Sequence, residues 1–476
     1  MQSQLHARWN RARAALVAPR DIASLVAFRV AFGLIVVASS LRFLAYGWID
    51  DMFVMPKFRF AYWGLGWVPA PSPAVTYALF AALAVLGALV AVGLWFRPAV
   101  ALLFLVFTYL QVVDATNYLN HYYLVSLLAA LMFFIPVHRA FSLDARRRPA
   151  IATTTVPAWC LYLLRFQVVV VYVNAGLAKA TGDWLLHAQP MNLWLSARTD
   201  LPVIGPYLDL PAVAYTAAWA GFLFDTTIAF FLLWRRTRPF AYVVVLAFHF
   251  ATHLLFPRIG MFPVIMVVAA LVFFDPSWPR RLLEAARRRI GAAPVAKVPA
   301  AAAVDATPIR GRWLGAGVAA ASVFMLVQVL FPLRSHLYGG NVSWHEQGMR
   351  FSWRVMTRAK NGIVTFTVRE PATGRQWEVA PAKYLTRMQE MDMAVQPDLI
   401  LQLAHHIARD FAANGHPGVE VHADARASLN GRPAAILVDP SADLAREPDG
   451  LAAKRWIRPA PAGPPPLLRP IRSRTL

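Results

Sequence analysis

A single lysine stands where a long apolar run of the sequence gives way to polar residues. The run covers residues 162–177, and Lys179 follows it shortly before Thr181 and Asp183. A lysine at such a boundary can serve as a membrane anchor, with its stem on apolar surface and its ammonium group in water. It can also be partly desolvated, and a desolvated amine gives up its proton more readily, which would let it act as a base near neutral pH. The spacing leaves both interpretations open.

Other polar residues are expected on the same side of the membrane as Lys179. Asn120 and His121 open one apolar segment, and His249 and His253 lie near the end of another. Ionisable groups at membrane depth are costly, so several of them converging on one side indicate a functional site. The alternatives are that His121 caps a helix and that the two later histidines form an interfacial pair.

The spacing of His249 and His253 also suits two metal ligands on one helix face. No glutamate lies between them, and no third ligand is identifiable in the sequence. Because a zinc site needs at least three protein ligands, no metal site is predicted.

Two further charges, Arg165 and Asp225, fall inside apolar segments. Either charge alone would be costly in lipid. We therefore expect the two residues to form a buried ion pair with a structural role.

The composition predicts a polytopic α-helical membrane protein. Of the 476 residues 58% are hydrophobic, and the mean hydropathy is +0.47. The formal net charge of +22 comes from short basic clusters between apolar runs, which suits orientation in an anionic bilayer and argues against nucleic-acid binding. The one cysteine, Cys160, excludes an intrachain disulfide or a zinc site built from thiolates.

Apolar runs long enough to cross a bilayer predict about nine transmembrane helices within residues 21–332, the segment expected to carry the active site. The predicted spans are residues 22–46, 74–96, 99–113, 121–137, 157–178, 211–234, 239–256, 259–274 and 313–331. A basic linker, residues 276–312, precedes the last of them.

The distribution of basic residues predicts the orientation of the bundle. With the basic N-terminus, residues 1–20, placed in the cytoplasm, the inner segments hold 20 Lys and Arg residues and the outer segments hold 5. The outer five include Arg258, and the inner twenty include Lys297 and Arg310. Because cytoplasmic loops carry the excess of positive charge, this asymmetry places everything after the ninth span outside.

Residues 333–457 are predicted to form an extramembrane α+β domain. Alternating segments at 363–369 and 376–379, and again at 419–428 and 433–438, flank turn residues and indicate two hairpins. Residues 398–413 have helical periodicity. The Pro-rich tail, residues 458–476, is expected to be disordered because it cannot form a core.

Five stretches of the sequence carry motifs of one known family. They are NHYYLVSLLA from Asn120, VPAWCLYLLRFQVVVVYVNAGLAKATGDW from Val156, FHFATHLLFPRIGMF from Phe248, SHLYGGNVSWHEQGMRFSWRVM from Ser335 and ASLNGRPAAILVDP from Ala427. Together they resemble the vitamin K-dependent γ-glutamyl carboxylases and their bacterial transmembrane relatives of the HTTM type. The resemblance runs in order over roughly residues 20–457.

The resemblance implies roles for five residues. In that family, the lysine of the motif matched by AGLAK deprotonates vitamin K hydroquinone, and Lys179 matches it. The Asn-His pair matched by Asn120 and His121 lies in the reaction centre. The stretch FSWRVM matches residues beside the quinone pocket, so Trp353 and Met356 are candidates for binding the cofactor.

The implied enzyme is a γ-carboxylase of the carbon–carbon lyase class, coupled to quinone epoxidation. Reduced vitamin K, of the menaquinol or phylloquinol type, reacts with O2 to give a base strong enough to remove a glutamate γ-proton, and the carbanion captures CO2. The implied partners are membrane lipid, the quinol and a Glu-containing peptide or protein, without a metal ion. The expected location is the bacterial inner membrane, with the C-terminal domain in the periplasm.

Two differences from the animal members of the family keep other functions open. Those members have two adjacent lysines where this chain has Ala178 and Lys179, and they continue well beyond residue 476. The first difference is harmless if only the second lysine acts. The second difference, in length, would permit a hydroquinone epoxidase that carboxylates no protein. A non-enzymatic membrane carrier of quinone or protons is a further alternative, although no inverted repeat favours transport.

Overall fold

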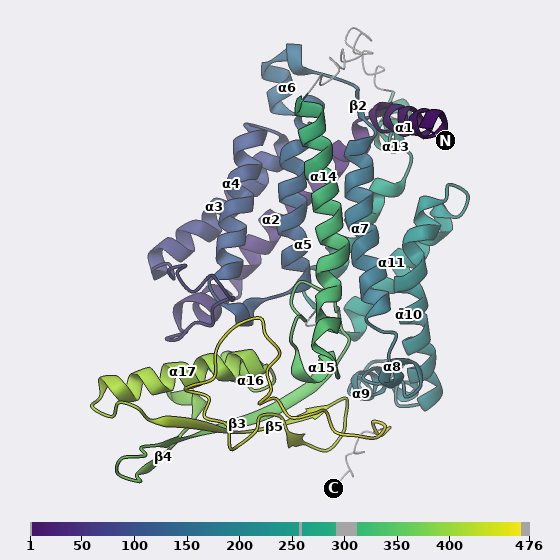
Figure 1. The fold of residues 1–476 in the computed structure, drawn as a ribbon. Helices are drawn as coiled ribbons and strands as arrows, with labels where there is room; N and C mark the ends of the chain where they lie inside the picture. The colour runs from purple at the N-terminus through teal and green to yellow at the C-terminus, as the bar shows by residue number, and fades with distance from the viewer. Residues whose placement is uncertain (1, 257–258, 292–311, 468–476) are drawn as a thin grey trace.

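The computed structural model describes residues 2–256, 259–291 and 312–467, which form a helical bundle with a sheet-containing region at one end (Figure 1). The longer helices are α1 (Gln2–Val17), α2 (Ala23–Ala45), α3 (Pro73–Val92), α4 (Phe96–Val112), α5 (Asn120–Phe134), α7 (Trp159–Leu177), α10 (Pro211–Leu233), α11 (Arg238–Leu255), α12 (Phe262–Ala270), α13 (Trp278–Arg289) and α14 (Arg312–Leu330). Shorter helices are α6 (Leu143–Arg147), α8 (Gly182–Leu185), α9 (Met191–Ser196) and α15 (Val342–His345).

The chain is a multi-pass membrane protein, but the predicted number of nine crossings is not confirmed. Six helices in the described part of the chain are long and apolar enough to span a bilayer: α2, α3, α7, α10, α11 and the helical segment Gly315–Tyr338. Phe262–Phe273 and Trp278–Arg289 would count as a seventh span if the pair, bent by 92°, is taken as one. The other predicted spans coincide with α4 and α5, whose 17 and 15 residues fall short of the roughly 20 that a perpendicular crossing needs.

Small residues determine how closely the first two spans pack. A Cβ atom added to Gly33 of α2 would lie 2.4 Å from the carbonyl oxygen of Gly87 in α3. Glycine therefore lets the two backbones approach, as is common between helices in membranes. Helix α3 begins where the Ser72 hydroxyl accepts a hydrogen bond from the Val75 amide, and it ends at Gly93, whose φ is 67°.

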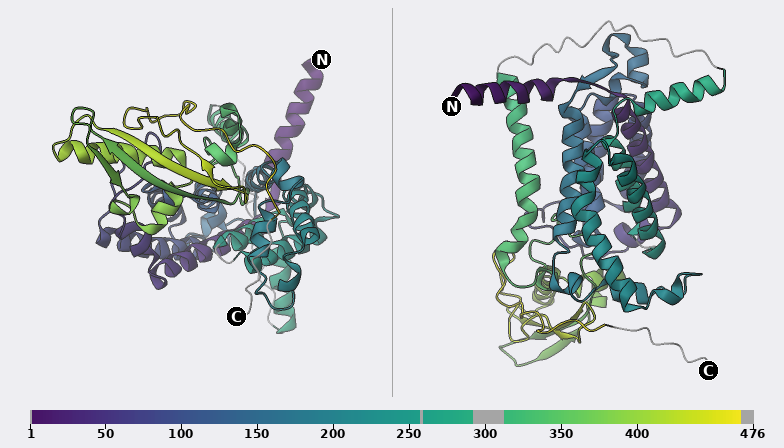
Figure 2. Two further views of the ribbon diagram at one scale, coloured as in Figure 1. Left: turned by 90° about the horizontal axis from the view of Figure 1, so that it is seen from below. Right: turned by 90° about the vertical axis from the view of Figure 1, so that its right-hand side faces the viewer.

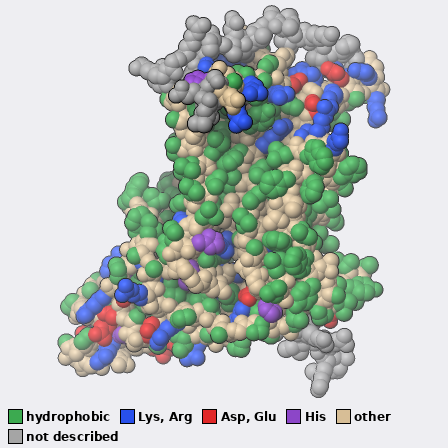
Figure 3. Space-filling view, turned by 45° about the vertical axis from the view of Figure 1, so that its right-hand side comes forward, with side chains coloured by type: hydrophobic (Ala, Val, Ile, Leu, Met, Phe, Trp, Pro, Cys, Tyr) green, Lys and Arg blue, Asp and Glu red, His purple; other side chains and the backbone are tan. Residues whose placement is uncertain are grey.

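The N-terminal helix and the sheet-containing region lie at opposite ends of the bundle. Helices α1 and α13 lie across one end, and α14 runs from that end to the sheet-containing region (Figure 2). Lys and Arg side chains gather near the end that carries α13, and hydrophobic side chains dominate the surface below it (Figure 3). At this end the short strands β1 (Pro19–Asp21) and β2 (Thr155–Pro157) pair antiparallel.

The sheet-containing region has a four-stranded antiparallel sheet in the order β4-β3-β5-β6. Its strands are β3 (Lys360–Arg369), β4 (Gln376–Val379), β5 (Glu420–Leu429) and β6 (Ala435–Ile436), and its helices are α16 (Arg387–Met393) and α17 (Pro397–Ala413). Alternate residues of β5 are buried in the same apolar core as the inner face of α17. Pleating explains this pattern, because successive side chains of a strand point to opposite faces.

Both predicted hairpins and the predicted helix of this region are confirmed. Strand β3 pairs with β4, β5 pairs with β6, and α17 covers the helical periodicity. The second hairpin turns at Asn430 and Gly431, which both have positive φ angles. The sequence did not predict the central pairing of β3 with β5, whose partners are separated by up to 69 residues at Lys360 and Leu429.

Residues 458–467, part of the Pro-rich tail that the sequence predicts to be disordered, lie within the described residues and are hydrogen-bonded to the rest of the chain. The carbonyl of Gly463 accepts hydrogen bonds from the Arg432 guanidinium, and the carbonyl of Pro466 accepts one of 2.8 Å from the Gln189 amide. Proline lacks an amide donor but keeps its carbonyl, so such a segment can be held by side-chain donors. Residues 468–476, most of the basic linker (292–311) and Arg258 of the charge count lie outside the described residues.

Candidate functional site

Lys179 is buried inside the protein. The residue comes just after the end of α7, and it is only 5% exposed. The ammonium nitrogen donates to three acceptors: the Asp225 carboxylate at 2.7 Å, the Val355 carbonyl at 3.1 Å and the Ala175 carbonyl at 3.2 Å. These three bonds use all three protons of an ammonium group. Lys179 therefore does not extend to water as a membrane anchor would.

The carboxylate partner of Lys179 comes from α10. Asp225 is 7% exposed, and Gly176 of α7 allows the two helices to meet beside it. A Cβ atom added to Gly176 would lie 2.7 Å from the backbone nitrogen of Thr226. This close crossing brings Asp225 to the end of α7, where Lys179 lies.

The predicted ion pair between Arg165 and Asp225 is wrong. Arg165 donates instead to the carbonyls of three consecutive residues where α12 gives way to a short turn: Val272, Phe273 and Phe274, at 2.8, 3.3 and 3.2 Å. The last carbonyls of a helix have no partner within it, so they can hold a guanidinium without a carboxylate. The sequence indicates Arg165 as the partner because both charges fall inside apolar segments. The signal for the pairing with Lys179 is the small residue Gly176, about one turn before the lysine.

The Val355 carbonyl that accepts from Lys179 lies on an irregular segment that follows α14. Phe351, Trp353 and Met356 have φ angles of 61°, 56° and 51°, a region that residues with side chains rarely adopt. Such backbone often occurs at functional sites. Trp353 is 1% exposed and stacks on Tyr123 of α5, with ring centroids 4.9 Å apart. The predicted cofactor residues Trp353 and Met356 thus flank Val355, which contacts Lys179 directly.

A second buried polar pair packs against Phe224, the residue before Asp225. The Tyr172 hydroxyl of α7 and the Nε2 atom of His249 in α11 are 3.1 Å apart, and both side chains are buried. Phe224 packs edge-on against both rings and stacks on Phe248 at 3.7 Å. His253, in contrast, is exposed, so it does not join this cluster. Among the described residues no group of three His, Cys, Asp or Glu side chains could hold a metal ion.

His121 and Asn120 lie farther along the same assembly of rings. Phe262 stands between His121 and His249, with ring centroids 6.1 and 5.9 Å away. Asn120 accepts a hydrogen bond of 3.0 Å from Tyr118. The three hydrogen bonds of Lys179 all go to other residues, so neither His121 nor Asn120 is bonded to the lysine.

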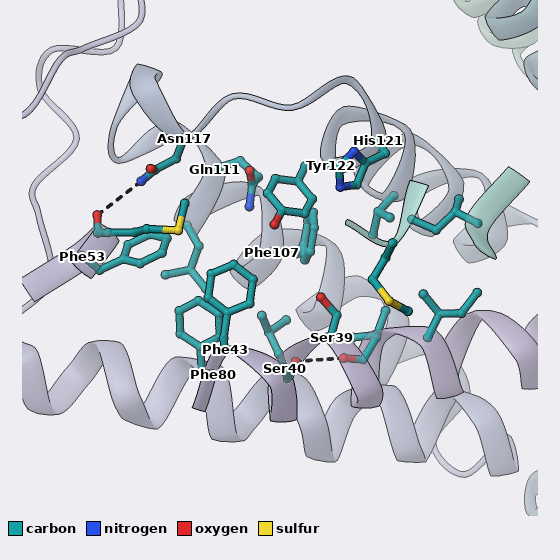
Figure 4. A pocket seen from close by; sticks show the side chains of 18 residues that line it. Ser39, Ser40, Phe43, Phe53, Phe80, Phe107, Gln111, Asn117, His121 and Tyr122 are labelled. Carbon is teal, nitrogen blue, oxygen red and sulfur yellow. Dashed lines mark hydrogen bonds between the residues drawn. The ribbon is translucent and has the colours of Figure 1, made fainter. Parts of the chain in front are cut away.

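His121 borders a small internal cavity among α2, α3, α4 and α5. Figure 4 shows His121 and Tyr122 on the side opposite Ser39 and Ser40, with Gln111 and Asn117 also lining the space. The cavity has a volume of about 30 Å³, enough for a water molecule and too small for an aromatic ring system.

An ion pair fastens the sheet-containing region to the bundle near Lys179. Both carboxylate oxygens of Asp183 accept hydrogen bonds of 2.6 Å from Arg432, and Asn430 donates a third of 2.8 Å. Burial acts to raise the pKa of Asp183, but the bonds from Arg432 and Asn430 outweigh it and hold the pKa below its usual range. The pair fixes the β5–β6 turn over the end of the bundle.

Comparison with known protein families gives two matches along the chain. Residues 17–278 match the HTTM domain, and residues 315–462 match the lumenal domain of vitamin K-dependent γ-carboxylase. No solved structure matches the chain significantly. Lys179 and Asp225 belong to the first matched region and Val355 to the second, so the site lies where the two regions meet.

These matches support a γ-carboxylase-like activity and imply a quinol and a Glu-containing substrate. The HTTM match covers more than half of the chain, which therefore belongs to the carboxylase-like HTTM family.

Proposed function

We propose that this protein is a γ-glutamyl carboxylase that depends on a vitamin K-type hydroquinone. The observation that carries the proposal is the buried Lys179 ammonium, held between Asp225 of the bundle and Val355. Val355 belongs to residues 315–462, which match the lumenal domain and are called the lumenal-type region below. In the overall reaction, hydroquinone, O2, CO2 and a glutamate residue give quinone epoxide, water and γ-carboxyglutamate. O2 is the oxidant, and the hydroquinone supplies the reducing electrons and the driving force for removal of the glutamate γ-proton.

Lys179 is the proposed base toward the hydroquinone. A lysine amine can accept a proton only in its neutral form. The 2.7 Å contact with Asp225 offers a route by which the ammonium group can first lose a proton. Its transfer to the carboxylate leaves a neutral amine and a neutral acid, which cost less to bury than two charges. Asp225 would therefore be a positioning residue that both orients Lys179 and shares its proton.

The surroundings of Lys179 are suited to a planar apolar molecule. The Trp184 ring lies 5.3 Å from the Lys179 nitrogen, and the Phe224–Phe248 stack lies beside Asp225. Trp353 and Met356 remain the proposed quinol contacts on the lumenal-type side, with His121 and Asn120 completing the proposed reaction centre. A site enclosed by such side chains excludes water, which a strongly basic reaction requires.

The proposed orientation places the basic end of the bundle in the cytoplasm of a bacterium. The concentration of Lys and Arg near α13 supports it, because cytoplasmic segments carry the excess of positive charge. The lumenal-type region would then lie in the periplasm, where it could meet exported peptides.

The decisive experiment uses purified protein in liposomes with reduced vitamin K, labelled bicarbonate and a Glu-containing peptide. Formation of epoxide together with label in the peptide is the expected result. Epoxide without labelled peptide would identify a hydroquinone epoxidase. Movement of quinone or protons across the vesicle membrane without either product would identify a carrier and overturn the enzymatic proposal.

A further inference from the structure

An apolar groove between α10 and α11 opens on the side of the bundle that faces lipid. Its volume is about 400 Å³, and its lining residues are Ala220, Leu223, Phe224, Thr227, Ile228, Phe231, Thr237, Phe240, Ala241 and Val244. Several of these side chains are strongly exposed, among them Phe240 at 76% and Leu223 at 50%. In a membrane such residues contact hydrocarbon, so the groove is accessible from the bilayer.

The two hydroxyl groups in the groove are already bonded to backbone carbonyls. Thr227 donates to Leu223 and Thr237 donates to Phe231, each at 2.7 Å. Serine and threonine in helices commonly satisfy their hydroxyls in this way. With no charged lining residue and both hydroxyls engaged, the groove offers a partner apolar contact and no site for a polar head group.

The inner wall of the groove is also a wall of the candidate site. Phe224 lines the groove, stacks on Phe248 and directly precedes Asp225, the partner of Lys179. Its ring also lies 6.0 Å from that of His249. Phe224 therefore belongs both to the wall of the groove and to the ring cluster around the buried polar groups.

The groove is large enough for a ligand, and the internal cavity at His121 is not. Small-molecule sites usually occupy about 300–1,000 Å³, a range that includes the groove and excludes the cavity of about 30 Å³. A hydroquinone whose ring is at Lys179 must still place its long side chain somewhere in the apolar part of the bundle.

We infer that the α10–α11 groove binds the isoprenoid chain of the hydroquinone, with the Phe224–Phe248 stack as the passage between chain and ring. This inference rests on the proposed function. It adds the side of the bundle from which the hydroquinone enters and the place where its isoprenoid chain binds. The occupant is the quinol side chain and not a phospholipid acyl chain, because the lining residue Phe224 directly precedes Asp225, the partner of Lys179.

A kinetic test uses two alanines on the lipid-exposed surface. Ala220 lines the groove, and Ala251 of α11 is exposed outside it. Ala220→Trp should raise the KM for a long-chain hydroquinone by about tenfold or more, the range expected for blocking an apolar subsite, and should leave the KM for a short-chain analogue nearly unchanged. Ala251→Trp should alter neither value. Unchanged long-chain KM in Ala220→Trp, or equal changes for both substrates, would overturn the inference.

A labelling test separates this inference from the proposed function. A vitamin K analogue with a diazirine on its side chain should crosslink to α10 and α11 in the intact protein, whether or not the protein turns it over. Ala220→Trp should reduce this labelling, and excess unlabelled long-chain quinone should compete with it. Equal labelling by a diazirine phospholipid that quinone does not displace would assign the groove to lipid and refute the inference. Failure of turnover with retained, competed labelling would refute only the carboxylase proposal.

Discussion

The two ends of the bundle bury positive charge with different partners. At the basic end Arg29 donates to the carbonyls of Ala91, Val137 and Phe141, and Arg165 donates to carbonyls after α12. At the other end Lys179 is bonded to a carboxylate. A carbonyl oxygen stabilises a cation but cannot take its proton, and arginine does not release one in proteins. The comparison indicates that the basic end provides structure, whereas the end with Lys179 has the groups needed to move a proton.

The largest effect is expected from removing the carboxylate at the Lys179 end. Asp225→Ala would leave a buried ammonium without its charged partner, which typically costs about 3–5 kcal/mol of stability. Thermal unfolding in detergent would measure the loss. The double variant Asp225→Ala/Lys179→Met should recover most of the stability, because no charge is then left unpaired. A single variant as stable as the double would mean that the pair is no more than a surface contact.

The next largest effect concerns the proton of Lys179. Lys179→Arg and Lys179→Ala should both insert in the membrane yet lose epoxide formation by about a hundredfold or more, as expected when a base is absent. Raising the pH should restore part of the rate to Lys179→Ala, since solvent then forms the hydroquinone anion. Arg165→Lys is the matched control. This variant should keep its rate of epoxide formation, because position 165 keeps its positive charge. Near-wild-type epoxidation by Lys179→Arg would show that Lys179, like Arg29, contributes a buried positive charge and does not act as a base.

A smaller effect is expected where the lumenal-type region is fastened to the bundle. Arg432→Ala removes two charge-assisted bonds to Asp183 and should cost about 1.5–3 kcal/mol. Arg426→Ala is the control, because Arg426 and Asp424 form an exposed pair whose loss typically costs less than about 1 kcal/mol. Proteolytic susceptibility of the lumenal-type region would report both. Equal susceptibility of the two variants would show that the Asp183 pair does not hold the regions together.

The smallest effect is a pH dependence of the same contact. The pKa of Asp183 is depressed in the folded protein, so its stabilising contribution is present above the unfolded value, about 4, and is lost as the pH falls through the lower folded value. Docking of the lumenal-type region should therefore be constant between pH 7 and pH 5 and weaken only in stronger acid. Arg432→Ala should remove this acid-induced step in the proteolysis assay. An identical acid profile in wild type and variant would assign the step to another carboxylate.

The sequence predicted local features well and contacts between distant residues poorly. Apolar runs located the helices, and turn residues such as Asn430 and Gly431 located the hairpins, because both signals depend on near neighbours. The partner of Asp225 depends on how α7 and α10 are rotated against each other, which hydrophobicity does not encode. The apolar boundary and the motif resemblance indicated Lys179, and the resemblance indicated Trp353 and Met356. Neither showed that Val355, between those two residues, contacts the lysine through a backbone atom.

The bond from Lys179 to Val355 also sets an order of assembly. The two residues are 176 positions apart, so the ribosome makes the acceptor roughly 10–35 s after the lysine. During that interval the nascent bundle has Asp225 and Ala175 for the ammonium, and its third proton lacks this partner. The site is therefore completed only when the lumenal-type region folds onto the inserted helices. On the proposed function, a partly synthesised chain would therefore lack a complete site for the reaction.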